Sequence, residues 1–285
     1  MFFFSFSAHW NEYIPDVMGK DDFKGIFIHS RNYRHVEVFE GLDVAILGGF
    51  RTAEDVALQI EEKARKVYVC HRTPDFPVSF PKSIEQRPPF VRMTEKGVVF
   101  PDGSELNVEA VIFCTGYRYT FPYLKDGLIN ITENRITPLY KHIVHMKYPS
   151  LVFPGVPQPY AYFPFLHQTA KFAVRVIDGR IKLPSEQEMV EESADDYKSR
   201  IQEGFKPKYA HLILHHMWDL DKELSKLGQF EHLPPVLEKL LEDILDERKM
   251  NITHAHELNY QITGSNSYRI LNPDGSKSRK TYATK

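Results

Sequence analysis

Two glycines join an apolar segment to a helical one in the run Asp43-Val-Ala-Ile-Leu-Gly-Gly-Phe-Arg-Thr-Ala-Glu-Asp-Val-Ala-Leu-Gln-Ile60. Residues 43–49 form a continuous apolar run, which is typical of a central parallel strand buried on both faces. Residues 52–64 then carry their apolar side chains on one helical face, and residues 66–72 have the pattern of a second strand. A strand, a helix and a strand of these lengths predict a βαβ unit.

The turn of this unit is Gly48-Gly-Phe-Arg-Thr-Ala53. A dinucleotide pyrophosphate binds at such a helix N-terminus, because free backbone N–H groups and the helix dipole favour anions. The usual fingerprint is G-x-G-x-x-G. In this chain Phe50 and Ala53 stand at the second and third glycine positions. The turn therefore predicts either a modified dinucleotide site or a plain strand–turn–helix with no ligand.

Two further strand ends bear on the cofactor. Arg72 follows the second strand, where an acidic residue would hold the ribose of NAD or an arginine would meet the 2′-phosphate of NADP. An arginine with no acidic residue before Asp75 favours NADP; the alternative is a solvated surface arginine. Residues 110–116 form another apolar run ending in glycine, which fits a ligand-contacting strand end or any tight turn.

Helical patterns follow in the second half of the chain, at 167–178, 186–203, 209–227 and 236–248. The third of these contains His211, His215 and His216 without the glutamate of the His-Glu-x-x-His zinc motif, so we expect them on a helix surface. Gly228 is placed to follow the last helical residue. The polar tail from residue 272 is expected to be loose.

Composition excludes several classes of protein. The chain has 285 residues, which fits about two domains. Its 36 basic and 38 acidic residues give a net charge of -2, which argues against a dedicated nucleic-acid partner. Two cysteines, Cys70 and Cys114, cannot build a disulfide framework and favour a reducing compartment. No apolar run approaches the roughly 18 residues of a transmembrane span. We expect a cytoplasmic protein, with peripheral attachment to the endoplasmic reticulum membrane as the alternative; the oligomeric state stays open.

Three separated segments carry a family resemblance. They are Phe23-x-Gly25-x-x-x-His29-x-x-x-Tyr33, Phe113-Cys-Thr-Gly-Tyr117 followed by Phe121-Pro-Tyr-Leu124, and Phe153-Pro-Gly155 followed by Phe163-Pro164 and Gln168. In this order they resemble the identifying motif, a second hallmark and the C-terminal flavin-domain stretch of the flavin-containing monooxygenases. The short spacing from Gly48 to Thr115 resembles the insect and plant-type members. The resemblance runs from about residue 9 to about residue 270.

The resemblance implies an α/β fold in which a Rossmann-like NADPH-binding domain is inserted into a FAD-binding dinucleotide domain, with a helical C-terminal region. The implied domains are 1–35 (remnant of the FAD-binding domain), 36–112 (NADPH-binding domain), 113–271 (C-terminal part of the FAD-binding domain with the helical region) and 272–285 (flexible tail). The family also has an N-terminal FAD-binding βαβ unit with its own G-x-G-x-x-G. This sequence contains no such unit, so we expect an N-terminally truncated, incomplete FAD-binding domain.

The implied activity is that of an oxidoreductase, a flavoprotein monooxygenase. NADPH reduces FAD, and molecular oxygen is then used to oxygenate a soft nitrogen or sulfur atom of a small amine or sulfide. The implied NADPH residues are Gly48, Gly49, Thr52 and Asp55 in the turn and Arg72 at the 2′-phosphate. Those implied near the flavin are Thr115, Gly116 and Gln168. No residue is assigned an acid–base role, and no metal is expected.

The incomplete FAD-binding domain and the bulky Phe50 leave a second hypothesis from another class. Under it, the chain is a catalytically inactive remnant that acts as an NADP(H)-binding or protein-interaction module.

Overall fold

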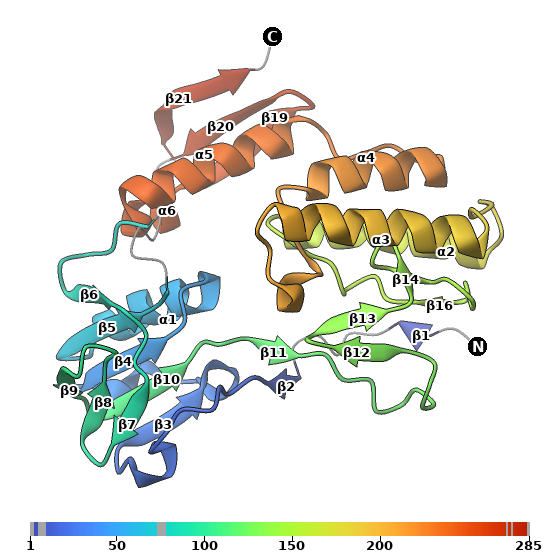
Figure 1. Ribbon diagram of the computed structural model, residues 1–285. Helices are drawn as coiled ribbons and strands as arrows, with labels where there is room; N and C mark the ends of the chain where they lie inside the picture. The colour runs from blue at the N-terminus through green and yellow to red at the C-terminus, as the bar shows by residue number, and fades with distance from the viewer. Residues whose placement is uncertain (1–2, 5–9, 73–77, 272, 275, 284–285) are drawn as a thin grey trace.

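The computed structural model describes residues 3–4, 10–72, 78–271, 273–274 and 276–283. Figure 1 shows two α/β lobes joined by a narrow ribbon, with a helical and β-stranded C-terminal segment above them. The first lobe is built on a five-stranded parallel sheet in the order β3-β10-β4-β5-β6. Its strands are β3 (Ile26–His29), β4 (Asp43–Leu47), β5 (Lys66–Cys70), β6 (Ile84–Arg87) and β10 (Ala110–Phe113).

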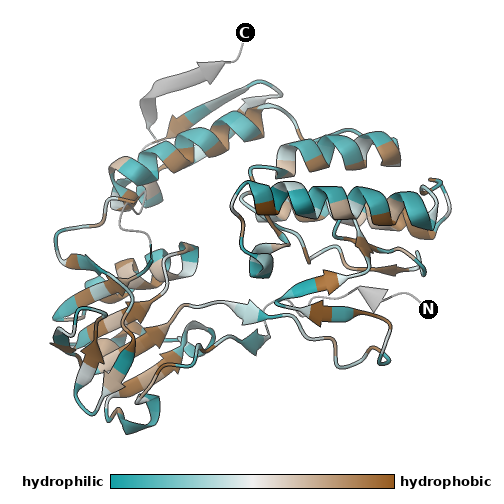
Figure 2. Ribbon diagram, viewed as in Figure 1, coloured by the Kyte–Doolittle hydropathy of each residue, from teal (hydrophilic) through white to brown (hydrophobic). Residues whose placement is uncertain are grey.

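The predicted βαβ unit is confirmed. Helix α1 (Arg51–Glu61) connects β4 to β5, which pair in parallel. Alternate residues of β4 face opposite sides of the sheet, as strand geometry requires. Val44 and Ile46 pack with α1. Ala45 and Leu47 pack against a small antiparallel sheet on the other face. Both faces of the sheet are therefore covered, and Figure 2 shows its strands as a predominantly apolar interior.

The small sheet has three antiparallel strands. It consists of β7 (Arg92–Thr94), β8 (Gly97–Val99) and β9 (Glu105–Asn107). The five-stranded sheet draws on distant parts of the chain, because β3 lies before residue 36 and β10 crosses residue 112. Both strands pair in parallel, β3 with β10 and β10 with β4. Long-range pairing of this kind has no local sequence signal.

The second lobe stacks helices on a small sheet, in the order β1-β16-β15-β14. The strands are β1 (Phe3–Phe4), β14 (Leu139–Tyr140), β15 (Val144–His145) and β16 (Leu151–Val152). Strand β1 pairs in parallel with β16. The helices are α2 (Tyr162–Ile177), α3 (Glu186–Gln202) and α4 (Met217–Gly228). Helix α3 begins at a capping box between Ser185 and Glu188.

The helix expected from residue 209 instead begins at Met217. Residues Leu212–Leu214 form strand β18, which pairs with β17 (Gln158–Pro159). The expected helix end is also displaced: Gly228 is the last helical residue, and Gln229 adopts the left-handed conformation with φ 54°. The left-handed position after the helix is thus held by a glutamine, one residue after the glycine that was expected there.

The C-terminal segment ends in a sheet. Helices α5 (Val236–Met250) and α6 (Ile252–Glu257) precede β19 (Asn259–Gly264), β20 (Ser267–Leu271) and β21 (Lys277–Ala283), which pair in that order. The expectation of a loose tail from residue 272 is therefore wrong for 277–283, which pair with β20. No helix in the described part of the chain is long and apolar enough to cross a membrane.

Two crossovers connect the lobes, and the antiparallel ribbon of β2 (Asn11–Glu12) and β11 (Tyr117–Arg118) forms where they meet. The remaining strands of the second lobe, β12 (Asn130–Thr132) and β13 (Arg135–Thr137), make a hairpin. The ribbon lies between the lobes in Figure 1. Residues that fasten it therefore set how the lobes are connected.

Candidate functional site

The carboxyl ends of the five parallel strands lie on one edge of the sheet. Phe113 of β10 is in register with the last residues of β3 and β4, and these ends align in turn with those of β5 and β6. Open parallel sheets bind ligands at this edge. Of the eight residues predicted as cofactor-binding, seven follow this edge or lie on the helix that starts from it; Gln168 lies in the second lobe.

Gly48 is required by the fold as well as by any ligand. Its φ is 144°, and a Cβ built on it would lie 2.3 Å from the carbonyl oxygen of Cys114. Its N–H donates to the carbonyl of Cys70 at 3.0 Å. The ends of β4, β5 and β10 therefore converge at this residue with no room for a side chain.

The N-terminus of α1 has free capacity for an anion. Its N-cap residue Phe50 offers no side-chain acceptor to the N–H groups of the first turn. Uncapped N–H groups and the helix dipole attract negative charge. The Phe50 ring is 53% exposed at this end of the helix, whereas Ala53 is fully buried against the sheet. Ala53, at the third fingerprint position, therefore still allows the helix and the sheet to pack closely. Phe50, at the second position, is the bulky departure from the fingerprint.

Arg72 follows the end of β5, and its guanidinium has no ion-pair partner among the described residues. It is exposed and makes no ion pair or hydrogen bond with any residue in the described ranges. Its neighbour His71 is buried instead, with Nε2 2.9 Å from Oε1 of Gln86. The next residues, 73–77, are not described. An exposed guanidinium at this position has the chemistry needed to meet a phosphate.

Basic groups that the sequence reasoning missed also reach α1. Arg248 of α5 is buried and pairs with the buried carboxylate of Glu54. His256 of α6 lies 3.4 Å from the carboxylate of Asp55, so one predicted turn residue faces a protein partner. Burial and the nearby charge of Arg248 lower the pKa of Arg51. No local signal could have found Arg248, which lies 194 positions from its partner.

Thr115 and Gly116 fasten the crossover between the lobes. The hydroxyl of Thr115 donates to the carbonyl of Tyr13. The carbonyl of Gly116 accepts from the N–H of Tyr13 at 2.9 Å and from Nε2 of His29 at 3.1 Å. Gly116 has φ 81°, and no atom lies near its Cβ position. These residues therefore have a structural role in addition to any contact with a cofactor.

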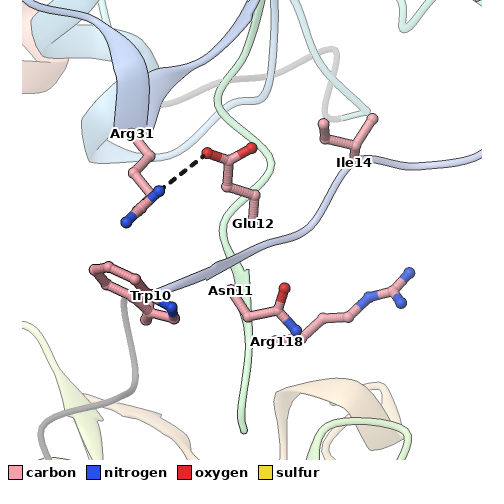
Figure 3. A pocket seen from close by; sticks show the side chains of 6 residues that line it. All are labelled: Trp10, Asn11, Glu12, Ile14, Arg31 and Arg118. Carbon is pink, nitrogen blue, oxygen red and sulfur yellow. Dashed lines mark ion pairs between the residues drawn. The ribbon is translucent and has the colours of Figure 1, made fainter.

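A hollow of about 370 Å³ opens beside this junction. Figure 3 shows its lining: Trp10, Asn11, Glu12, Ile14, Arg31 and Arg118. Glu12 and Arg31 form an ion pair at 3.6 Å, and the Arg31 guanidinium lies 4.1 Å from the centre of the Trp10 ring. The charges of these two side chains are paired, and the guanidinium of Arg118 lies 5.0 Å from the centre of the Tyr13 ring.

Gln168 is committed to protein partners. It is buried on α2, and its Nε2 donates to Asp221 and to the carbonyl of Glu231, both at 2.9 Å. Its Oε1 accepts from Lys171 at 3.0 Å. Both amide donors and the acceptor oxygen are thus used within the second lobe.

Two further kinds of chemistry have little support. Burial raises the pKa of both Cys70 and Cys114 to about 12, so neither thiol is a nucleophile at neutral pH. Within the described ranges, no three His, Cys, Asp or Glu side chains are grouped so as to hold a metal ion.

Comparisons with known proteins assign the family. The model of the flavin-binding monooxygenase-like family matches residues 5–80 and 75–268. The chain belongs to this family. It is 31% identical over 229 residues to a flavin-containing monooxygenase FMO GS-OX-like 8 of Arabidopsis thaliana, covering 77% of this chain and 49% of that protein. It is 29% identical over 255 residues to senecionine N-oxygenase of Tyria jacobaeae, covering 83% and 55%.

A solved structure confirms the mixed α/β fold. The S-allyl-L-cysteine S-oxygenase from Allium sativum superposes with a TM-score of 0.75 at 28% identity, over 85% of this chain and 56% of that one. The chain spans about half the length of the curated relatives it matches.

The structure gives a physical account of the family motif. A Cβ on Gly25 would lie 2.2 Å from the carbonyl oxygen of Glu109, so only glycine lets β3 approach β10 at this point. Nδ1 of the buried His29 accepts from the N–H of Arg31, so Nε2 carries the proton that is donated to Gly116. The Tyr33 hydroxyl donates to Gln59 of α1. The motif therefore locks β3 and α1 to the crossover.

Proposed function

We propose that this chain forms the NADPH-binding and C-terminal parts of a flavin-dependent monooxygenase that oxygenates soft nitrogen or sulfur atoms in small amines or sulfides. The observation that carries the proposal is the carboxyl edge of the sheet, where the uncapped N-terminus of α1 lies one strand away from the uncommitted Arg72. Relatives named for oxygenation at nitrogen and at sulfur support the reaction class. The same names give no support to the alternative of an inactive remnant.

The described residues fit one of the two cofactors. Gly48, Gly49 and Thr52 would lie under the pyrophosphate of NADPH, Asp55 would close that turn, and Arg72 would contact the 2′-phosphate. This assignment needs the Phe50 ring to move aside. For FAD, the described residues contain no second glycine turn leading into a helix. Thr115, Gly116 and Gln168 are proposed to lie near the flavin from the resemblance, and their polar groups bond to protein.

In the proposed enzyme, the cofactor and the residues of this chain have different roles. FAD, when bound, supplies the redox and oxygen chemistry of the family. The residues of this chain place the nicotinamide cofactor and tie the two lobes together through Thr115, Gly116 and His29. The domain limits and a cytoplasmic location stay predictions, the latter resting on the cysteine content.

The proposed reaction is tested by oxygen uptake. Purified protein supplied with FAD and a tertiary amine or a thioether should consume oxygen with NADPH in preference to NADH. Arg72→Gln should weaken binding of NADPH about tenfold and leave NADH unchanged, because one charge-assisted contact to phosphate contributes about 1.5–3 kcal/mol. Arg92→Gln, an exposed arginine of β7, is the matched control. A protein that binds NADPH no more tightly than NADH would overturn the proposal.

Phe50 offers a separate test of the turn. Phe50→Gly should tighten NADPH binding several-fold, because it removes a ring from the N-terminus of α1 and lets the backbone approach phosphate. Isothermal titration would measure the affinity, and Phe50→Ala would separate loss of the ring from gain of backbone freedom. Unchanged affinity in both variants would mean that this turn does not hold the pyrophosphate.

A further inference from the structure

A second cavity, of about 660 Å³, lies in the other lobe among β13, β14, the loop that follows them, and helices α3 and α4. None of the eight residues predicted as cofactor-binding lines it. One wall is apolar and includes Ile136, Leu139, Met146, Ile213 and Leu220. The volume is in the range of small-molecule sites, which combine apolar walls with a few convergent polar groups.

A chain of hydrogen bonds leads through buried histidines to this cavity. The N–H of Ile136 donates to Nε2 of His211 at 2.9 Å. Nδ1 of His211 lies 3.0 Å from Nδ1 of His142. Nε2 of His142 lies 3.6 Å from the carboxylate of Asp196 on α3. His211 was expected on a helix surface together with His215 and His216. That expectation is wrong for His211, which is only 5% exposed and lies before β18.

The order of donors and acceptors fixes the tautomers of both rings. Nε2 of His211 accepts a hydrogen bond from the backbone N–H of Ile136, so its Nδ1 carries the hydrogen and donates to His142. Nδ1 of His142 is then an acceptor, and its Nε2–H points toward Asp196. Burial lowers the pKa of His211 to about 3 and that of His142 well below its usual value, so both rings are neutral at pH 7.

Asp196 lines the mouth of the cavity, with its side chain 50% exposed. Its only ion-pair contact within 4.0 Å among the described residues is with the neutral ring of His142. Partial burial raises the pKa of its carboxyl group, and the charges of Arg200 and Lys141 act against that rise. The neutral ring of His142 adds no charge to this carboxylate.

Arg200 presents the opposite charge one turn further along α3. It is 4% exposed, and its Nη2 donates to the carbonyls of Tyr209 and Leu212. Its Nε is buried and has no hydrogen-bond partner. A spacing of four residues favours ion pairs on a helix, yet Asp196 and Arg200 are not joined by one within 4.0 Å. The wall thus holds two opposite charges, each short of a partner.

We propose that this cavity binds a small zwitterion of the α-amino-acid type, with its ammonium group on Asp196, its carboxylate on Arg200 and its side chain against the apolar wall. The two anchors are four residues apart on α3, about 6 Å along the axis, and both line the same cavity. An anion alone would meet a lining with five acidic side chains against three basic ones. A cation alone would leave the Nε of Arg200 unpaired.

Three probes that share one carbon chain test the proposal on the protein without cofactors. L-norleucine carries both charges, hexanoate lacks the ammonium group, and n-pentylamine lacks the carboxylate. In isothermal titration at pH 7, norleucine should bind at least tenfold more tightly than either single-charge probe. Equal affinity for norleucine and a single-charge probe, or no binding of norleucine at millimolar concentration, would refute it.

Variants locate the binding. Asp196→Asn should weaken norleucine about tenfold and leave hexanoate unchanged, whereas Asp246→Asn, at an exposed acid paired with Lys249 outside the cavity, should change neither. Norleucine binding that is unaffected by Asp196→Asn would place it elsewhere and defeat the proposal. If Asp196→Asn does not fold, the comparison of the three probes on the unaltered chain still decides. Because no flavin or NADPH is present, the result is independent of the proposed monooxygenase activity.

Discussion

Replacing Arg248 by methionine should lower the free energy of unfolding by about 3 kcal/mol or more, because it leaves the buried carboxylate of Glu54 without its partner. Glu54 is 6% exposed and Arg248 is 8% exposed, so water cannot replace the lost ion pair. The pair also joins α5 to α1. Nearby, the N–H of Ser79 donates to the carbonyl of Arg248 and the N–H of Ile252 donates to the carbonyl of Ser79, which ties the segment before β6 to α5 and α6. Urea unfolding monitored by circular dichroism would measure the change.

Two controls separate the buried charge from other effects. Lys249→Met removes the neighbouring positive charge, which makes only an exposed pair with Asp246, and should change stability by less than about 1 kcal/mol. The double variant Glu54→Leu with Arg248→Met should recover much of the loss, because no charge is then left buried. A double variant as unstable as Arg248→Met alone would contradict this account.

Acid should destabilise the protein through the buried histidine pair. At pH 5, His211 should account for about 2 kcal/mol less stability than at pH 7. Its pKa is about 3 in the folded protein and lies near 6.5 when unfolded, so between these values the unfolded chain binds the extra proton. Stability is then lost as pH falls below about 6.5. His142, whose folded pKa is also lowered by burial, adds a loss in the same direction.

Comparing the unaltered protein with His211→Gln separates the contribution of His211 from that of the carboxyl groups, which titrate equally in the two proteins. The glutamine of His211→Gln keeps a donor and an acceptor but does not titrate. Between pH 7 and pH 5, the free energy of unfolding of this variant should fall by about 2 kcal/mol less than that of the unaltered protein. His232→Gln, at an exposed histidine, should retain the full pH dependence. Urea unfolding midpoints of the unaltered protein and of both variants at pH 7 and pH 5 would measure the difference. An unchanged pH dependence in His211→Gln would show that this ring is not the acid-sensitive group.

Short sequence patterns predicted the helices and strands whose formation depends on residues close together in the sequence. The apolar run 43–49, its glycines and the amphipathic stretch that follows became β4 and α1, because strand burial and helical periodicity are properties of short segments. The limits of α3 and the start of α5 were predicted to within a residue or so, with a capping serine at one and two prolines before the other. The resemblance likewise rested on short motifs, and the comparisons confirmed the family.

Only the tertiary structure explains why glycine is required at two of the motif positions. Gly48 and Gly25 look like ligand-binding or turn glycines in the sequence, but the carbonyls of Cys114 and Glu109 exclude a side chain at each. Those carbonyls belong to β10 and its approach, more than sixty positions away. Periodicity in one segment cannot report a contact made by another.

The sequence alone determined the βαβ unit, the glycine turn and the family, because each is written in neighbouring residues. Tertiary structure alone decided what surrounds them. It buried His211 against His142, 69 positions away, where a helix surface had been expected. It also brought Arg248 to Glu54 and left Asp196 and Arg200 unpaired at one cavity. Buried charge depends on which distant groups exclude water, and that is settled only when the chain has folded.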